Sequence, residues 1–162
     1  ARRARAFGMS IAYANRKPVD GAVERELDAT FMSQAELLAT SDVVSLNCPY
    51  SPATHHLIGA AQLSSMKPSA FLVNTARGPI VDEAALVEAL NAGTIAGAGL
   101  DVFEHEPAVH PGLLECEQAV LVPHLGSATV ETRSAMARLA ASNVAAVLTG
   151  GTPPTPIAVP AT

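Results

Sequence analysis

Three side chains capable of charge and proton-transfer chemistry stand in three short segments of the chain: Arg77, Glu106 and His124. The planar guanidinium of Arg77 could hold a substrate carboxylate through two parallel hydrogen bonds. The imidazole of His124 could donate and recover a proton near neutral pH. A carboxylate such as Glu106 could orient that imidazole and favour its charged form. Together these residue types predict a site that binds a small anion and transfers a proton.

Each of these residues follows an apolar stretch that is typical of a buried strand. The predicted strands cover residues 10–14, 43–47, 70–75, 96–102 and 119–123. The predicted helices cover residues 1–7, 34–40, 60–66, 83–92 and 129–148. Apolar strands separated by helices predict an α/β fold with a parallel sheet covered on both faces. Ligands of such sheets bind beyond the carboxyl ends of the strands, which is where the three candidate residues lie.

Helix boundaries have their own signals. Gly8 and Gly93 are suited to the left-handed conformation that ends a helix. Ser33 and Glu36 have the spacing of a capping box, which predicts a helix starting at residue 34. Asp82 is expected to cap the helix that follows it.

Composition excludes several classes of protein. The 162 residues are 49% hydrophobic and 15% charged, which argues against a disordered chain. A formal net charge of −5 argues against nucleic-acid binding, and no apolar run is long enough for a membrane span. Cys48 and Cys116 form neither a disulfide framework nor a metal-ligand cluster, so we expect a reduced, cytoplasmic protein without a metal site. The remaining histidines are expected to be solvent-facing loop residues: His55, His56, His105 and His110.

Several motifs match one enzyme family. The run from Val73 to Leu86, which contains Arg77, strongly resembles the signature of the D-isomer-specific 2-hydroxyacid dehydrogenases. Two further motifs of that family correspond to Asp101-Val102-Phe103 with Glu106-Pro107 and to Pro123-His124 with Gly126-Ser127. The segment from Leu46 to Pro49, with Thr54, is similar to the family's loop beside the nicotinamide ribose. The four motifs occur in the family's order and span nearly the whole chain.

The resemblance implies roles for these residues. Arg77 would bind the substrate carboxylate and 2-oxo group, and His124 would protonate the carbonyl oxygen as hydride arrives from the nicotinamide. Glu106 would keep the imidazole in its protonated form. A cation and a proton donor stabilise the negative charge that hydride addition builds on oxygen. The residues expected to line the cofactor site are Cys48, Pro49, Thr54, Thr75, Ala76, Arg77, Asp101, His124 and Gly126.

The choice of dinucleotide depends on the turn after the strand at residues 10–14. NAD-binding sites place an acidic residue there for the ribose 2′-hydroxyl, whereas an arginine accommodates the 2′-phosphate of NADP. This chain has Asn15, Arg16 and Lys17 at that turn. We therefore favour NADP(H), with NAD(H) as the alternative, and glyoxylate, hydroxypyruvate or a similar small 2-oxo acid as substrate.

The sequence also lacks parts that the family contains. No glycine-rich dinucleotide fingerprint occurs in it, and Gly97-Ala98-Gly99 is better explained by close packing within a strand. We expect a Rossmann-like doubly wound sheet that lacks its first strand and glycine loop. Residues 1–149 would form a partial dinucleotide-binding domain, and residues 150–162 would form a proline-rich tail of the substrate domain. The 162-residue chain alone is expected to show little or no activity, and the complete protein to be a homodimer.

Other functions remain compatible with the same residues. Within the family, a phosphoglycerate dehydrogenase-like enzyme is the nearest enzymatic alternative, and the substrate-binding domain that would distinguish the two is expected to lie outside this sequence. A dinucleotide-sensing protein similar to transcriptional corepressors would keep Arg77, Glu106 and His124 without turnover. A truncated product that only folds or dimerises is the third alternative.

Overall fold

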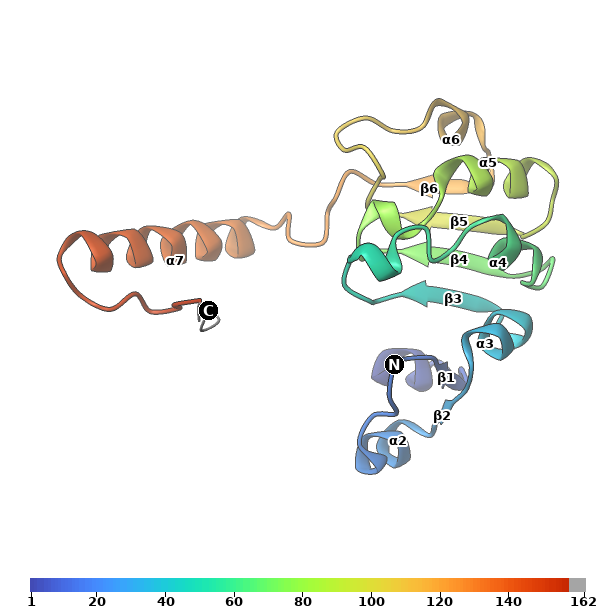
Figure 1. The fold of residues 1–162 in the computed structure, drawn as a ribbon, viewed down its shortest axis with the longest axis horizontal. Coiled ribbons are helices and arrows are strands. Elements are labelled where there is room, and N and C mark those ends of the chain that lie inside the picture. Colours follow the sequence, from blue (N-terminus) through green and yellow to red (C-terminus); the bar gives the residue numbers. More distant parts are fainter. Residues whose placement is uncertain (158–162) are drawn as a thin grey trace. The chain divides into compact units, whose positions relative to one another are not determined.

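The computed structural model describes residues 1–157, which divide into two compact units, one of residues 1–123 and one that begins at His124. The first unit contains two parallel sheets (Figure 1). The smaller sheet pairs β1 (Ile11–Tyr13) with β2 (Ala29–Phe31). The larger sheet has the order β3-β4-β5-β6. Its strands are β3 (Val43–Leu46), β4 (Phe71–Asn74), β5 (Gly97–Leu100) and β6 (Ala119–Leu121).

The register of the larger sheet brings the carboxyl ends of its strands into line. Leu46 is opposite Asn74, Asn74 is opposite Leu100, and Leu100 is opposite Leu121. The loops after the four strands therefore leave the sheet at one edge. This confirms the parallel α/β architecture expected from the alternation of apolar strands and helices.

Helices cover one face of this sheet. Leu72 and Leu100 point to this face and are 0% and 3% exposed. They share the hydrophobic core with Leu63 of α4 (Ala60–Ser64), Leu86 of α5 (Glu83–Asn91) and Leu113 of α6 (Pro111–Glu115) (Figure 1). Leu38 of α3 (Gln34–Thr40) belongs to the same core.

The opposite face of the sheet carries side chains that the rest of the first unit leaves accessible. Val43, Phe71 and Val120 are 43%, 49% and 68% exposed. The apolar strands predict cover on both faces, and within the first unit helices provide it on one. Within the first unit, β1 is paired only with β2 and β3 only with β4, so each has one long side without a neighbouring strand. This agrees with a Rossmann-like sheet that is incomplete in this chain.

The predicted helix signals are confirmed where the structure describes them. Ser33 Oγ accepts from the Glu36 N–H (3.2 Å), while Glu36 accepts from the Ser33 N–H (3.0 Å), so α3 begins with a capping box. Asp82 Oδ1 accepts from the Ala85 N–H at 3.0 Å at the start of α5. Gly8, with a φ of 78°, follows α1 (Arg2–Ala6), and Gly93, with a φ of 66°, follows α5.

Sequence patterns failed to predict three short elements. They are α2 (Gly21–Leu27), β2 and α6. Asp20, whose side chain accepts from the Ala22 N–H, is the cap that indicates α2. For α6 the signals are Pro111 at its first position and the side chain of His110, which caps it.

The second unit contains the helix α7 (Val130–Leu148), as predicted for residues 129–148, and none of its residues is buried. Thr129 caps it by accepting from the Thr132 N–H. Residues 150–157 form no helix or strand, and residues 158–162 of the predicted tail, including Pro160, lie outside the described part of the chain. No helix in residues 1–157 is long and apolar enough to cross a membrane.

Candidate active site

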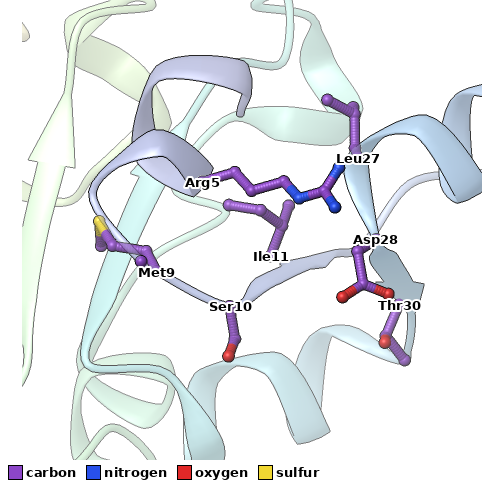
Figure 2. A pocket seen from close by; sticks show the side chains of 8 residues that line it. Arg5, Met9, Ser10, Ile11, Leu27, Asp28 and Thr30 are labelled. Carbon is purple, nitrogen blue, oxygen red and sulfur yellow. The ribbon is translucent and has the colours of Figure 1, made fainter.

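A hollow of about 390 Å³ lies among residues of the smaller sheet and its flanking helices. Figure 2 shows Ser10 and Ile11 at the start of β1 and Asp28 and Thr30 at the start of β2 among the residues that line it. Arg5 also points into it. The hollow is therefore at the amino ends of parallel strands, whereas ligands of open α/β sheets bind at the carboxyl ends. It contains none of the predicted site residues.

A second hollow, of about 690 Å³, is formed by the loops that follow β3 and β4. Its size is within the range of small-molecule and cofactor sites. It lies beyond the carboxyl ends of two paired strands, as expected for a ligand site of this fold. Its lining residues are Asn47, Cys48, Pro49, Tyr50, Ala76, Arg77 and Pro79. Four predicted site residues therefore come together here: Cys48, Pro49, Ala76 and Arg77.

The loop that carries Arg77 is held by a buried asparagine. Asn74, the last residue of β4, is 1% exposed. Its Oδ1 accepts from the Ala76 N–H, and its Nδ2 donates to the Arg77 carbonyl oxygen, both at 3.0 Å. The Arg77 guanidinium donates to the Ala76 carbonyl oxygen at 2.7 Å and is otherwise exposed toward the hollow. Sequence reasoning noted Asn74 only as part of a motif and missed this role.

Gly78 brings the Arg77 loop against the loop that follows β5. A Cβ at Gly78 would lie 1.9 Å from the backbone carbon and oxygen of Phe103 and 2.4 Å from the Glu104 nitrogen. Only glycine allows two backbones to approach this closely. The Phe103–Glu106 segment is thus tied directly to the segment that carries Arg77. A glycine next to a candidate catalytic arginine is the signal that could have predicted it.

Glu106 is exposed and lies in a tight loop of the first unit. Its Oε1 accepts from the Phe103 N–H at 3.0 Å, and the Glu106–Pro107 peptide is cis. Asp101 follows β5 directly, and its N–H donates to the Asn74 carbonyl oxygen at 3.0 Å, next to the Arg77 loop. Asp101 is 8% exposed. Glu106 and Asp101 thus lie on one loop that starts at the same sheet edge as Arg77.

Other predicted cofactor residues occupy loops at carboxyl ends of strands. Thr54 fastens the loop after β3, because its Oγ1 accepts from the Ser51 N–H (2.8 Å) and donates to the Pro49 carbonyl oxygen (2.9 Å). Thr75 is exposed immediately after β4. The turn after β1 presents the exposed residues Asn15, Arg16 and Lys17.

His124 and Gly126 begin the second unit and are both exposed. His124 has a φ of 52°, a left-handed conformation that non-glycine residues adopt rarely. Such backbone outliers occur preferentially at functional sites, because the surrounding structure must stabilise them. In the sequence, His124 follows the carboxyl end of β6 by three residues, just as Arg77 follows the carboxyl end of β4 by three residues.

The expectation that the remaining histidines face solvent fails for two of them. His56 is partly buried, and its Nε2 is 2.7 Å from Glu104 Oε1. His110 caps α6 by accepting from the Gly112 N–H at 3.2 Å. His55 and His105 are exposed. No group of three or more His, Cys, Asp or Glu side chains in the described residues 1–157 could hold a metal ion.

Comparison with known proteins gives one consistent result. Residues 1–126 match the family described as D-isomer specific 2-hydroxyacid dehydrogenase, NAD binding domain. A glyoxylate reductase of Thermococcus onnurineus is 52% identical over 157 residues, which cover 96% of this chain and 46% of that protein. Glyoxylate/hydroxypyruvate reductase B of Erwinia tasmaniensis is 50% identical, with coverage of 89% and 45%.

Solved structures agree with these sequence relatives. The NADPH-dependent glyoxylate/hydroxypyruvate reductase of Sinorhizobium meliloti, crystallised with NADP and malonate, superimposes with a TM-score of 0.86 at 43% identity. The match covers 97% of this chain and 48% of that one. The chain therefore spans about half the length of the relatives it matches.

Proposed function

Because the chain belongs to the D-isomer-specific 2-hydroxyacid dehydrogenase family, as part of its NAD-binding domain, we propose that the complete protein reduces a small 2-oxo acid such as glyoxylate or hydroxypyruvate. The observation that carries this proposal is the hollow beyond β3 and β4, where Arg77 lies beside the Cys48–Pro49 loop. A nicotinamide dinucleotide bound there supplies the hydride. The loop residues Cys48, Pro49 and Ala76 would hold its nicotinamide end.

The residues of this chain would perform three tasks. Arg77 binds the substrate carboxylate and 2-oxo oxygen through its guanidinium, while the Asn74 hydrogen bonds hold the backbone of the loop that carries it. His124 donates a proton to the oxygen on which negative charge develops. Glu106 orients the His124 ring and stabilises its charged form. The left-handed backbone of His124 and the tight loop of Glu106 support these two roles.

The test is a steady-state assay of the full-length protein with glyoxylate and hydroxypyruvate. Replacing Arg77 with Gln removes the charge and the planar fork, and kcat/KM should fall by about 10²- to 10³-fold. Arg77→Lys keeps the charge without the fork and should retain only part of the activity. A folded protein that binds dinucleotide but reduces no 2-oxo acid would contradict the proposal.

NADP(H) is the dinucleotide that we propose. Arg16 and Lys17 offer two exposed cations after β1, and no carboxylate stands at Asn15 to repel a 2′-phosphate. Val19 donates its N–H to Tyr13 Oη at 2.9 Å, which closes the turn that carries them. Arg16→Asp should lower the ratio of kcat/KM for NADPH over NADH by about ten- to hundredfold. Arg138→Asp, the same charge change on an exposed residue of α7, should leave that ratio unchanged.

The proposed complete protein is a homodimer that acts in the cytoplasm. The dimer is supported by the apolar surface of α7, where the exposed fractions of Val130, Met136, Val144 and Val147 range from 55% to 78%. Such a surface is typical of a contact with another chain or domain. Sedimentation of the full-length protein tests it, and a monomer at micromolar concentration would contradict it.

A further inference from the structure

Three contacts fasten the Phe103–Glu106 loop to the rest of the first unit. Gly78 packs against the Phe103 backbone. The Glu104 N–H donates to Glu83 Oε1 at 2.8 Å, and Glu83 itself is only 4% exposed at the start of α5. The third contact joins the Glu104 side chain to His56, which is 48 residues away in the sequence.

The His56–Glu104 contact is a short hydrogen bond between partly buried side chains. Nε2 of His56 lies 2.7 Å from Glu104 Oε1, and the Glu104 side chain is 16% exposed. An ionised carboxylate only accepts hydrogen bonds, so Nε2 carries the hydrogen. The other titratable groups facing His56 are Asp82, whose Oδ2 is 3.9 Å from Nδ1, and His55, whose ring is stacked at 3.9 Å.

The backbone of His56 is held in an uncommon conformation. Its φ is 48°, in the left-handed region. Its N–H donates to the Pro79 carbonyl oxygen at 2.9 Å, one residue beyond Gly78. Conformations of this kind persist where surrounding contacts stabilise them. The His56 backbone thus binds the Arg77–Pro79 segment, and its side chain binds the loop of Glu106.

We propose that His56 is a positioning residue, which through Glu104 holds the loop of Glu106 in place against the segment that carries Arg77. The proposal rests on the role proposed above for Glu106. The hydrogen bond between His56 and Glu104 is called the clamp below. Because the Glu104 side chain is engaged in the clamp, Glu106 is the carboxylate of this loop that we assign to the proton donor. The loop also closes on itself through the Phe103 N–H and Glu106 Oε1, so displacement at Glu104 is transmitted to Glu106.

The first experiment measures the loop directly in the full-length protein without substrate. His56→Gly keeps the left-handed turn without strain but removes the side chain, so it separates the two roles of the residue. Hydrogen exchange of the Phe103 and Glu104 amides should become about ten- to hundredfold faster, as expected for loss of a hydrogen bond to a charged group. His105→Gln, a change at an exposed histidine of the same loop, should leave the exchange unchanged.

The second experiment follows kcat/KM against pH. The proposed proton donor is an imidazolium, so activity should fall as pH rises, and displacement of the carboxylate proposed to stabilise that charge should move this fall to lower pH. Glu104→Ala should shift the pH profile as His56→Gly does. In a protein that already carries Glu106→Gln, neither change should shift the profile further. A purely structural residue would lower the rate without moving the pH profile.

The outcomes distinguish the two proposals. Unchanged amide exchange and an unshifted profile in His56→Gly and Glu104→Ala, with a shift in Glu106→Gln, would overturn the clamp and leave the proposed reaction intact. Full activity and an unshifted profile in Glu106→Gln would overturn the role of Glu106 itself. Faster exchange together with the shared shift would support both.

Discussion

A methyl group at Gly78 should disturb the candidate site, because two backbone segments leave no room for it. In Gly78→Ala the new Cβ would lie 1.9 Å from the Phe103 carbonyl group, and both atoms that it meets there are backbone. The Phe103–Glu106 loop would have to move by at least about 1.5 Å to reach an ordinary contact distance. Overpacking of this kind costs about 1–3 kcal/mol, and we expect the upper end because no flexible side chain can yield.

Activity should fall together with stability in this variant. Displacement of a catalytic group by about 1 Å can lower the rate by about 100-fold. Gly78→Ala separates the Glu106 loop from Arg77, so kcat/KM for a 2-oxo acid should fall by about that factor. Urea unfolding of the full-length protein, followed by circular dichroism, measures the stability, and a spectrophotometric assay of cofactor oxidation measures the activity.

Gly99→Ala is the matched control. Its Cβ would meet Val73 Cγ2 at 4.0 Å, an ordinary contact, and the φ of Gly99 is not positive. It should be neutral or stabilise the protein by up to about 1 kcal/mol, because alanine reduces the freedom of the unfolded chain. If Gly78→Ala matched this control in both unfolding midpoint and kcat/KM, the close approach of the two loops would be refuted.

Further predictions concern single hydrogen bonds. Asn74→Ala leaves the Ala76 N–H and the Arg77 carbonyl without their partner and should destabilise the protein by about 1–3 kcal/mol in urea, whereas the exposed Asn47→Ala should change stability by less than about 0.5 kcal/mol. Ser33→Ala should cost about 1 kcal/mol at neutral pH through loss of the α3 cap. A second hydrogen bond, from the Ser33 hydroxyl to the Glu36 carboxylate, lowers the pKa of Glu36; its added stability is fully present above the ordinary glutamate pKa and is lost as the pH falls through the lowered pKa, so the difference in stability between Ser33→Ala and the parent should shrink there. Tyr13→Phe removes the acceptor for the Val19 N–H and should raise KM for NADPH about fivefold with kcat retained; an unchanged KM would exclude Tyr13 from shaping that turn.

Local sequence patterns were sufficient for much of the fold. Helix caps act over three or four residues, so Ser33 with Glu36 and Asp82 with Ala85 could be predicted without knowledge of the rest of the chain. Apolar strands alternating with helices likewise predict a parallel sheet. The elements that were missed are short, and their apolar residues are too few to form a pattern.

The residue types of the candidate site and its position at the carboxyl ends of the strands could be predicted from the sequence. A parallel sheet aligns the carboxyl ends of its strands, and the register Leu46–Asn74–Leu100–Leu121 does so here. The motifs therefore had to emerge at one edge, as Cys48, Ala76 and Arg77 do.

Tertiary structure alone decided how the loops at that edge are fastened. Asn74 supports Arg77, Gly78 admits the Phe103 backbone, and His56 meets Glu104 across 48 residues of sequence. Nothing in the vicinity of His56 distinguishes it from the exposed His55, because both are loop histidines in the same polar turn. The difference arises when the register of the sheet brings two distant loops together, and that alignment depends on the packing of the whole core.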